Sequence, residues 1–566
     1  MKHVYDLRAS RAQNNCYPMP RRFLEKEPAE EQNAQHDCED VDYNFNDTHT
    51  ILGNVIKSPS KYLANYKSMP ARGEVSTRLR LNKAVVWAFP LILQIFTFAA
   101  AQGSDVEIRL DIEGKRPTIT GSFAPSDEQR AKNNISFVLS TAGVESLGER
   151  IGNVRAFDAD GAELSLRTLV PGEYLAPRPP VRWSYDIDLR PPANRLGSPH
   201  VSWLGMAGGF LMLGDLLPFE GRRERSARVK VILPRGWRTV SVHPTEADGS
   251  LKIDDVSRAV IAVVRENTQP ITFRSKRGAA YEMLITGEWQ FSRADAEAML
   301  GQIAEEYEKL FDARPAERVL INVVPFPQGG GVGDWAAETR GSTVTIVSGG
   351  TPFATQSPQR LHEQLRHELF HLWLPNGVRL TGSYDWFYEG AALYVSLKTG
   401  ARVGRITFAN FLETLSQAAA IDARMPAGSL LDASAGRWRG NTTGVYARGI
   451  LTAFALDVAM QDASRGKRSM DGFVRRLFVE NREREADGNA TILRMLGEMP
   501  ETTPIAERHI KGSDRLDMAK IGLAAGVVWE GRRFTLTEKP TGRQRAILRD
   551  LGYNSERRRP RYQNEK

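Results

Sequence analysis

Three histidines lie between residues 362 and 371, in the segment RLHEQLRHELFHLWLP. Within it, the run HELFH places His367 and His371 four residues apart, with Glu368 directly after the first histidine. Residues four apart share one face of a helix, so both imidazoles can point at a single metal ion. Glu368 lies about 100° further round the helix, which places its carboxylate near a metal-bound water instead of on the metal. The spacing therefore predicts a metal site with a general base beside it.

Two imidazoles do not complete a catalytic zinc site, which takes three protein ligands and keeps one position open for water. The next predicted helix, in YDWFYEGAALYVSLKTG, carries Glu389. Its distance from His371 leaves room for a turn and a return helix, so we expect Glu389 to be the third ligand of one zinc ion (Zn²⁺) per chain. His362 and Glu363 form a similar pair, but residue 366 is Arg, so we interpret His362 as a histidine on the surface or behind the ligands.

The combination of HELFH and WFYEGAALYV resembles the gluzincin metallopeptidases, in which a glutamate followed by glycine and small residues begins the third-ligand helix. The resemblance implies that His367, His371 and Glu389 bind zinc. It also implies that Glu368 activates the water and then carries its proton to the leaving amine.

A second segment, VYARGILTAFALDVAM, places Tyr446 in a Tyr-x-basic-Gly context. In gluzincin aminopeptidases the tyrosine of this segment donates a hydrogen bond to the oxyanion, a role that suits a phenol opposite the metal. The alternative is that Tyr446 is a core aromatic on an amphipathic helix. A weaker match around 510–527 makes the chain most similar to the glycyl aminopeptidase family, without a full PDZ domain.

One expected segment is absent. Classical gluzincin aminopeptidases carry a Gly-x-Met-Glu-Asn segment whose glutamate holds the free amine of the substrate, whereas the corresponding region here reads QGGGVGDWAAETRGSTVTI. Asp334 and Glu338 are the acidic candidates for that role, and neither stands at a motif position. The choice between aminopeptidase and endopeptidase therefore stays open, with aminopeptidase favoured by the resemblance.

The elements that must position these residues divide the chain into three regions after residue 101. Alternating apolar and polar runs such as VEIRLDI and ARVKVIL predict a β-rich domain over 102–287. Residues 288–530 begin with a helix capped by Ser292, continue with strands, and are mostly helical from about 358. Residues 531–566 read as a short extension with a basic tail. We thus expect an α+β multidomain fold with an N-terminal β-sheet domain, a mixed segment that the resemblance makes thermolysin-like, and a mainly helical catalytic domain.

The N-terminal part reads as a targeting segment. Basic residues precede the apolar run AVVWAFPLILQIFTFAAA, which ends in small residues before Gln102, so 69–101 reads as a signal peptide and 1–68 as a disordered leader or an over-extended start. We expect export to the periplasm or secretion, or attachment to a membrane through an uncleaved segment at 84–101. Both cysteines lie in the removed part, which excludes a thiol nucleophile and cysteine-ligated zinc in the remainder.

Composition narrows the partners. Hydrophobic residues make up 41% and charged residues 25% of the 566 residues, as in ordinary globular domains. The formal charge of +8 includes the tail residues Arg557, Arg558, Arg559 and Arg561, which is more typical of a solvated tail than of a nucleic-acid-binding arm. We therefore expect a peptide or protein substrate and no nucleic acid, with the oligomeric state open. The alternatives are a non-catalytic peptide-binding protein and another zinc hydrolase on the same scaffold.

Overall fold

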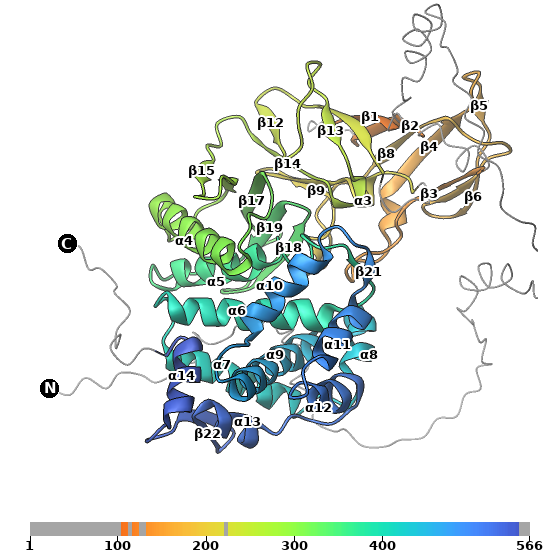
Figure 1. Cartoon of the computed structure of the whole chain (residues 1–566). Helices are drawn as coiled ribbons and strands as arrows, with labels where there is room; N and C mark the ends of the chain where they lie inside the picture. Colours follow the sequence, from red (N-terminus) through yellow and green to blue (C-terminus); the bar gives the residue numbers. More distant parts are fainter. Residues whose placement is uncertain (1–103, 111–115, 124–131, 220–224, 554–566) are drawn as a thin grey trace, which may run out of the picture. The chain divides into compact units, whose positions relative to one another are not determined.

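The computed structural model describes residues 104–110, 116–123, 132–219 and 225–553 (Figure 1). The predicted leader, signal peptide and basic tail lie outside these ranges. Within them, no helix is both long and apolar enough to cross a membrane. The architecture confirms the predicted fold class, because β-sheets come first, a mixed segment follows, and helices dominate the C-terminal half.

The described residues of the N-terminal region form three β-sheets. The largest has the strand order β13 (Leu251–Ile253), β11 (Ala227–Ile232), β1 (Ser104–Arg109), β2 (Thr118–Ser122), β8 (Arg182–Ile187), β4 (Ile151–Phe157) and β5 (Glu163–Leu164). A small sheet comprises β3 (Asn134–Ser136), β7 (Glu173–Leu175) and β6 (Arg167–Val170). The third has the order β12 (Trp237–Val240), β14 (Val260–Arg265), β10 (Gly208–Met212) and β9 (Trp203–Gly205), and the short α3 (Leu213–Leu216) follows β10.

Sequence alternation explains the large sheet. In β8 the buried residues are Trp183, Tyr185 and Ile187, and the residues between them are less buried. Alternate side chains of a strand point to opposite faces, so these three enter the core and the others face outward. The pairing of β1 with β11 is parallel and joins segments more than 110 residues apart, so no local pattern predicts it.

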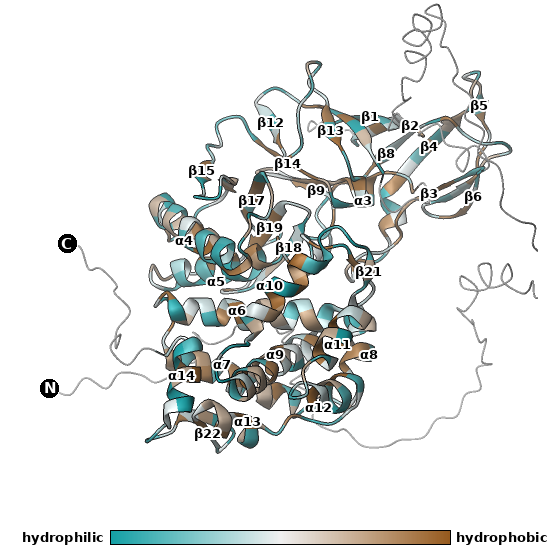
Figure 2. Cartoon of the chain, viewed as in Figure 1, coloured by the Kyte–Doolittle hydropathy of each residue, from teal (hydrophilic) through white to brown (hydrophobic). Residues whose placement is uncertain are grey.

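The mixed segment is built on a five-stranded sheet with the order β15 (Ile271–Arg274), β16 (Ala280–Ile285), β17 (Arg318–Pro325), β19 (Thr343–Ser348) and β18 (Trp335–Arg340). Helix α4 (Arg293–Phe311) crosses from β16 to β17, and it begins as predicted at Ser292, which forms a capping box with Asp295. Polar and apolar residues alternate along α4 at helical spacing (Figure 2). Strand β18 lies at the edge of this sheet and, as described below, borders the candidate site.

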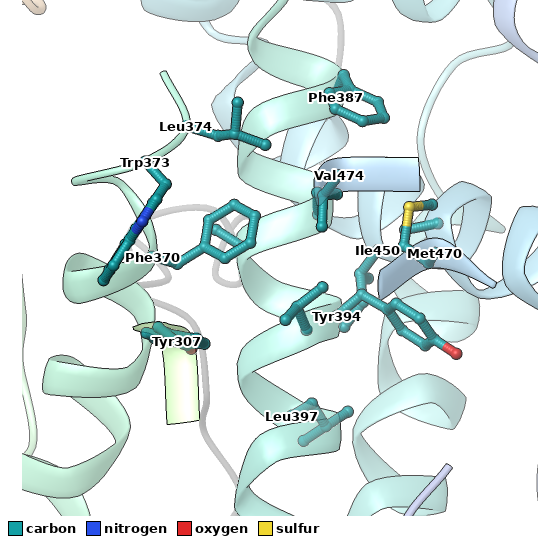
Figure 3. Close-up of a cluster of buried hydrophobic side chains, with 14 of the residues drawn as sticks. Tyr307, Phe370, Trp373, Leu374, Phe387, Tyr394, Leu397, Ile450, Met470 and Val474 are labelled. Carbon is teal, nitrogen blue, oxygen red and sulfur yellow. The ribbon is translucent and has the colours of Figure 1, made fainter. Parts of the chain in front are cut away.

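The helical region contains α5 (Gln356–Phe370), α6 (Asp385–Arg402), α7 (Phe408–Asp422), α8 (Leu430–Ala435), α9 (Thr442–Ser464), α10 (Met470–Asn481), α11 (Gly488–Gly497), α12 (Thr503–Ile505), α13 (Met518–Ala525) and α14 (Gly542–Asp550). Two short pairings, β20 (Leu380–Thr381) with β21 (Ala486–Asp487) and β22 (Val527–Glu530) with β23 (Arg533–Leu536), complete it. Helix α6 packs against both α5 and α9. Figure 3 shows side chains from the neighbouring elements converging on α6, among them Phe370, Ile450 and Val474, all buried.

Two details of the helical region bear on the site and on the C-terminal end of the described residues. Helix α5 ends at Phe370, because the backbone tightens and the amides of His371 and Leu372 bond to carbonyls three residues back. The predicted C-terminal extension contains β23 and α14. Asp550 of α14 lies 2.9 Å from the fully buried ammonium of Lys398, which also contacts Asp457 at 2.8 Å and Asp471 at 3.1 Å.

Candidate metal centre

The three predicted ligands meet in the interior of the helical region. We call His367, His371 and Glu389 the ligand triad; His367 lies in α5, His371 caps that helix, and Glu389 lies in the second turn of α6. The two Nε2 atoms are 3.2 Å apart, and Glu389 Oε2 lies 3.3 Å from His367 Nε2 and 3.5 Å from His371 Nε2. All three residues are buried.

This arrangement fits a metal ion. Atoms bound about 2.0–2.2 Å from a tetrahedral ion lie roughly 3.3–3.6 Å apart, which is close to the observed triangle. Glu389 Oε2 is buried and has no hydrogen-bond partner. Burial alone would lower the pKa of His371, but Glu389 and Glu368 raise it to about 9, so the surroundings favour positive charge at this point. Two imidazoles and one carboxylate are the donor set of catalytic zinc sites, and these residues could hold zinc.

A backbone contact orients the second histidine. His371 Nδ1 lies 2.9 Å from the carbonyl oxygen of Leu374, so this nitrogen donates and Nε2 keeps its lone pair toward the triad. The carbonyl is available because the helix has ended at Phe370 and the chain turns. The tightened turn at the end of α5 therefore contributes directly to the geometry of the site.

Glu368 lies beside the triad without joining it. Its Oε1 is 3.9 Å from His367 Nε2, and its Oε2 accepts a hydrogen bond of 2.8 Å from the hydroxyl of Thr339 in β18. Burial raises the pKa of Glu368, and the two histidines only partly oppose this shift. A carboxylate with a raised pKa is a stronger proton acceptor than an ordinary glutamate, as the predicted general base requires. No sequence pattern pointed to Thr339, because it reaches Glu368 only through the position of β18 at the edge of its sheet.

The crossing of α6 and α9 brings Tyr446 to the same place. Gly390 and Gly449 face each other at the crossing, and a Cβ built on Gly390 would lie 2.5 Å from the carbonyl carbon of Gly449. The glycines of the Glu-Gly and Tyr-x-basic-Gly segments therefore allow the close approach of the two helices. The Tyr446 ring centroid lies 6.4 Å from that of His367, and Tyr446 borders the same cavity as the triad.

An arginine that sequence reasoning missed lies between these groups. Arg437 belongs to a short 3-10 helix, η6 (Arg437–Arg439), and is buried. Its Nη1 lies 2.9 Å from both Glu389 Oε1 and Asp385 Oδ1, and its Nη2 donates to the Tyr446 hydroxyl at 2.7 Å. The segment GRWRG has no periodicity and matches no motif considered above, so only the structure identifies it.

The cavity over these residues measures about 240 Å³ and receives residues from several elements. The N-terminal β-sheet region contributes Thr141, Ala142 and His200, and the segment after α8 contributes Trp438, which is 45% exposed. The cavity is smaller than typical sites for drug-sized ligands. A small, partly enclosed space of this kind suits a short stretch of peptide.

The two acidic candidates for amine binding differ in position, because one borders the cavity and the other does not. Glu338 borders the cavity, where His200 Nδ1 lies 2.6 Å from its carboxylate. Burial alone would raise the pKa of Glu338, but His200, Arg340 and Arg437 lower it to about 2, so the carboxylate is ionised. Asp334 does not border the cavity and pairs with Arg195 at 2.5 Å.

His362 is the one histidine of the segment that the structure places away from the triad. It is not on the surface, because only 2% of it is exposed, and neither ring nitrogen has a hydrogen-bond partner. Burial together with the nearby Arg366 holds its pKa well below the usual value, so it is a neutral core histidine. Of the two positions expected for His362 from the sequence, the surface position is therefore wrong.

No protein-family model matches the sequence, and no curated protein matches it significantly. Solved structures do match. An aminopeptidase N family protein from Idiomarina loihiensis is 15% identical with a TM-score of 0.63, and the match covers 75% of this chain and 78% of that protein. A mutant M1 zinc metallopeptidase from Deinococcus radiodurans bound to a Tyr-Ser-Ala substrate is 16% identical with a TM-score of 0.50, covering 74% and 95%. The chain therefore has the multidomain fold of M1 zinc metallopeptidases, whereas the narrower resemblance to glycyl aminopeptidases stays a prediction.

Proposed function

We propose that the chain is a zinc-dependent peptidase of the gluzincin type, which hydrolyses peptide bonds with a water that Glu368 activates. The observation that carries the proposal is the convergence of the ligand triad, Glu368 and Tyr446 on one cavity. The shared fold with M1 zinc metallopeptidases supports it.

Each group has a distinct part in the reaction. Zinc held by the ligand triad would polarise the scissile carbonyl and lower the pKa of water. Glu368 accepts the proton of the attacking water and passes it to the nitrogen of the leaving amine. Burial keeps the pKa of Tyr446 well above its usual value, so its phenol stays protonated and can donate to the oxyanion of the tetrahedral intermediate.

Replacing Glu368 by Gln tests the reaction. Glutamine keeps the size of the side chain and an oxygen for Thr339, but it removes the proton acceptor. We expect normal zinc content with kcat lowered by about 10²–10⁴ and little change in KM. Glu363→Gln is the matched control, because Glu363 lies on the same helix and pairs with Arg360 at 2.8 Å.

The outcomes separate the rival functions. A parent protein that binds zinc and peptide but turns over no member of a peptide library would be a binding protein. Turnover of other bonds alone would indicate another zinc hydrolase. If Glu368→Gln keeps the turnover of the parent on every cleaved peptide, the proposed mechanism is wrong.

Within this proposal, aminopeptidase activity is favoured over endopeptidase activity. The ionised carboxylate of Glu338 borders the small cavity, and we propose that it binds the free amine of a peptide there. Glu338→Gln is expected to raise KM for peptides with a free amine and to leave N-acetylated peptides unaffected. Asp334→Asn, outside the cavity, is the control. Mass spectrometry of the products decides the class, because internal cleavage of N-acetylated peptides would indicate an endopeptidase.

Export is part of the same proposal and rests on the sequence alone. Cleavage of 69–101 would leave a protein that begins near Gln102 and acts in the periplasm or outside the cell. N-terminal sequencing of exported material checks this start. Membrane-bound material that still carries residues 84–101 would indicate the anchored alternative.

A further inference from the structure

The oxygens of the Glu389 carboxylate have different partners. Oε2 faces the Nε2 atoms of His367 and His371 at 3.3 and 3.5 Å, whereas Oε1 lies 2.9 Å from Arg437 Nη1. A carboxylate that is free to rotate can present both oxygens to a metal ion. Here the guanidinium occupies one oxygen, so Glu389 would present one ligand atom to zinc and leave a position open for water.

The second contact of the same guanidinium is with Tyr446. Arg437 Nη2 donates to the phenol oxygen at 2.7 Å. A tyrosine hydroxyl has one proton, and arginine has no acceptor. Because the phenol oxygen already accepts from Arg437, its own proton must point to another acceptor. Glu389 lies within hydrogen-bond reach of the phenol, and Tyr446 also borders the cavity in which the oxyanion would form.

Burial and contacts with neighbouring residues restrict the position of the Arg437 side chain. It is 7% exposed and lies between two glycines, of which Gly440 has a φ of +100° that other residues rarely adopt. Asp385 lies one helical turn before Glu389 on α6 and lies 2.9 Å from the same Nη1. A planar guanidinium with several partners is more rigid than a lysine ammonium, which acts as a point charge.

We propose that Arg437 is a positioning residue that sets two groups at once: it restricts Glu389 to one metal-ligating oxygen, and it directs the Tyr446 hydroxyl into the cavity. The inference deepens the proposed function and rests on it for the role of Tyr446. The part of the proposal that concerns Glu389 can be tested by metal binding alone. A purely structural ion pair between Arg437 and the carboxylates of α6 is the competing explanation.

Three variants separate these explanations. Arg437→Lys keeps the charge but cannot hold Glu389 and Tyr446 together, and Arg437→Met removes the charge. Asp385→Asn removes one carboxylate partner and leaves the contacts with Glu389 and Tyr446. Arg448→Met is the control for loss of a buried arginine, because Arg448 pairs with Asp422 at 2.9 Å and does not border the cavity.

Two measurements do not need turnover. Zinc affinity comes from competition with a chelator, and oxyanion binding comes from the affinity of zinc-loaded protein for a phosphinic dipeptide, whose tetrahedral phosphorus group stands in for the intermediate. For both Arg437 variants we expect zinc affinity lowered about 10–100-fold. We expect Asp385→Asn and Arg448→Met to stay within a few-fold of the parent, even where Arg448→Met lowers Tm.

Measurements of kcat and KM then test the part of the proposal that concerns Tyr446. At saturating zinc, Arg437→Lys should lower kcat at least about tenfold with little change in KM. Combined with Tyr446→Phe it should add little further loss of kcat or of phosphinate affinity, because both changes remove the same interaction. Parent-like zinc affinity and kcat in Arg437→Lys would overturn the proposal, and so would losses that multiply in the double variant. If the parent hydrolyses no peptide, the proposed function fails while the zinc and phosphinate measurements still decide the role of Arg437.

Discussion

The glycine contact between α6 and α9 allows a sharp test of the site geometry. In Gly449→Ala the new Cβ would lie 2.7 Å from the carbonyl oxygen of Trp386 and 3.0 Å from Gly390 Cα, both backbone atoms. Ordinary contact begins at 3.4 Å, so the helices must separate by roughly 0.4–0.7 Å. Overpacking of this kind costs about 1–3 kcal/mol of folding free energy.

The same displacement should also lower kcat. Tyr446 moves with α9, whereas the ligand triad stays with α5 and α6, which pack against each other. A misplacement of about 1 Å can cost about 10²-fold in rate, so we expect kcat to fall roughly 10–100-fold while zinc affinity stays within a few-fold.

The assay combines thermal unfolding, zinc titration and kcat on one peptide. Gly497→Ala in α11 is the matched control, because a Cβ there meets no atom within 4 Å. The control should be neutral or more stable by up to about 1 kcal/mol and fully active. A Gly449→Ala protein that is as stable and as active as the parent would refute the argument that the close crossing positions Tyr446.

Three further predictions follow from the site and the core. Glu389→Ala should lose zinc, and chelation should abolish activity; full zinc occupancy in this variant would show that another residue is the third ligand. Tyr446→Phe should lower kcat by about 10²–10³ with little change in KM, and full activity would mean that the phenol only packs. Burial alone would raise the pKa of Asp471, but Lys398 and Arg402 lower it from 3.8 to about 2. Ionised Asp471 therefore contributes roughly 2 kcal/mol of stability above pH 4, which is lost as the pH falls toward 2; urea unfolding of Asp471→Asn should show a weaker dependence on pH in that window.

The convergence of the triad side chains was predictable from spacing because it depends largely on local helical geometry. His367 and His371 share a face four residues apart, and Glu389 lies on the helix that returns against them. The glycine context of Tyr446 carried information for a similar reason, since Gly449 is required where α9 meets α6.

The rest of the site depends on contacts between distant segments. Thr339 reaches Glu368 only because β18 is the last strand of its sheet, and Arg437 reaches Glu389 from a segment without periodicity. The parallel pairing of β1 with β11 was equally invisible, because strands alternate in the same way whichever neighbour they choose. Tertiary packing, and not local preference, decides all three.

The mixed origin of the cavity wall has a consequence for peptide specificity under the proposed function. The groups assigned to bond breaking lie on α5, α6 and α9, whereas Thr141, Ala142 and His200 of the β-sheet region form part of the wall. Substitutions in that outer wall can change which peptides fit without disturbing the metal ligands or the general base. Under the proposed function, the turn at residues 141–142 is therefore the place to begin altering peptide specificity by design.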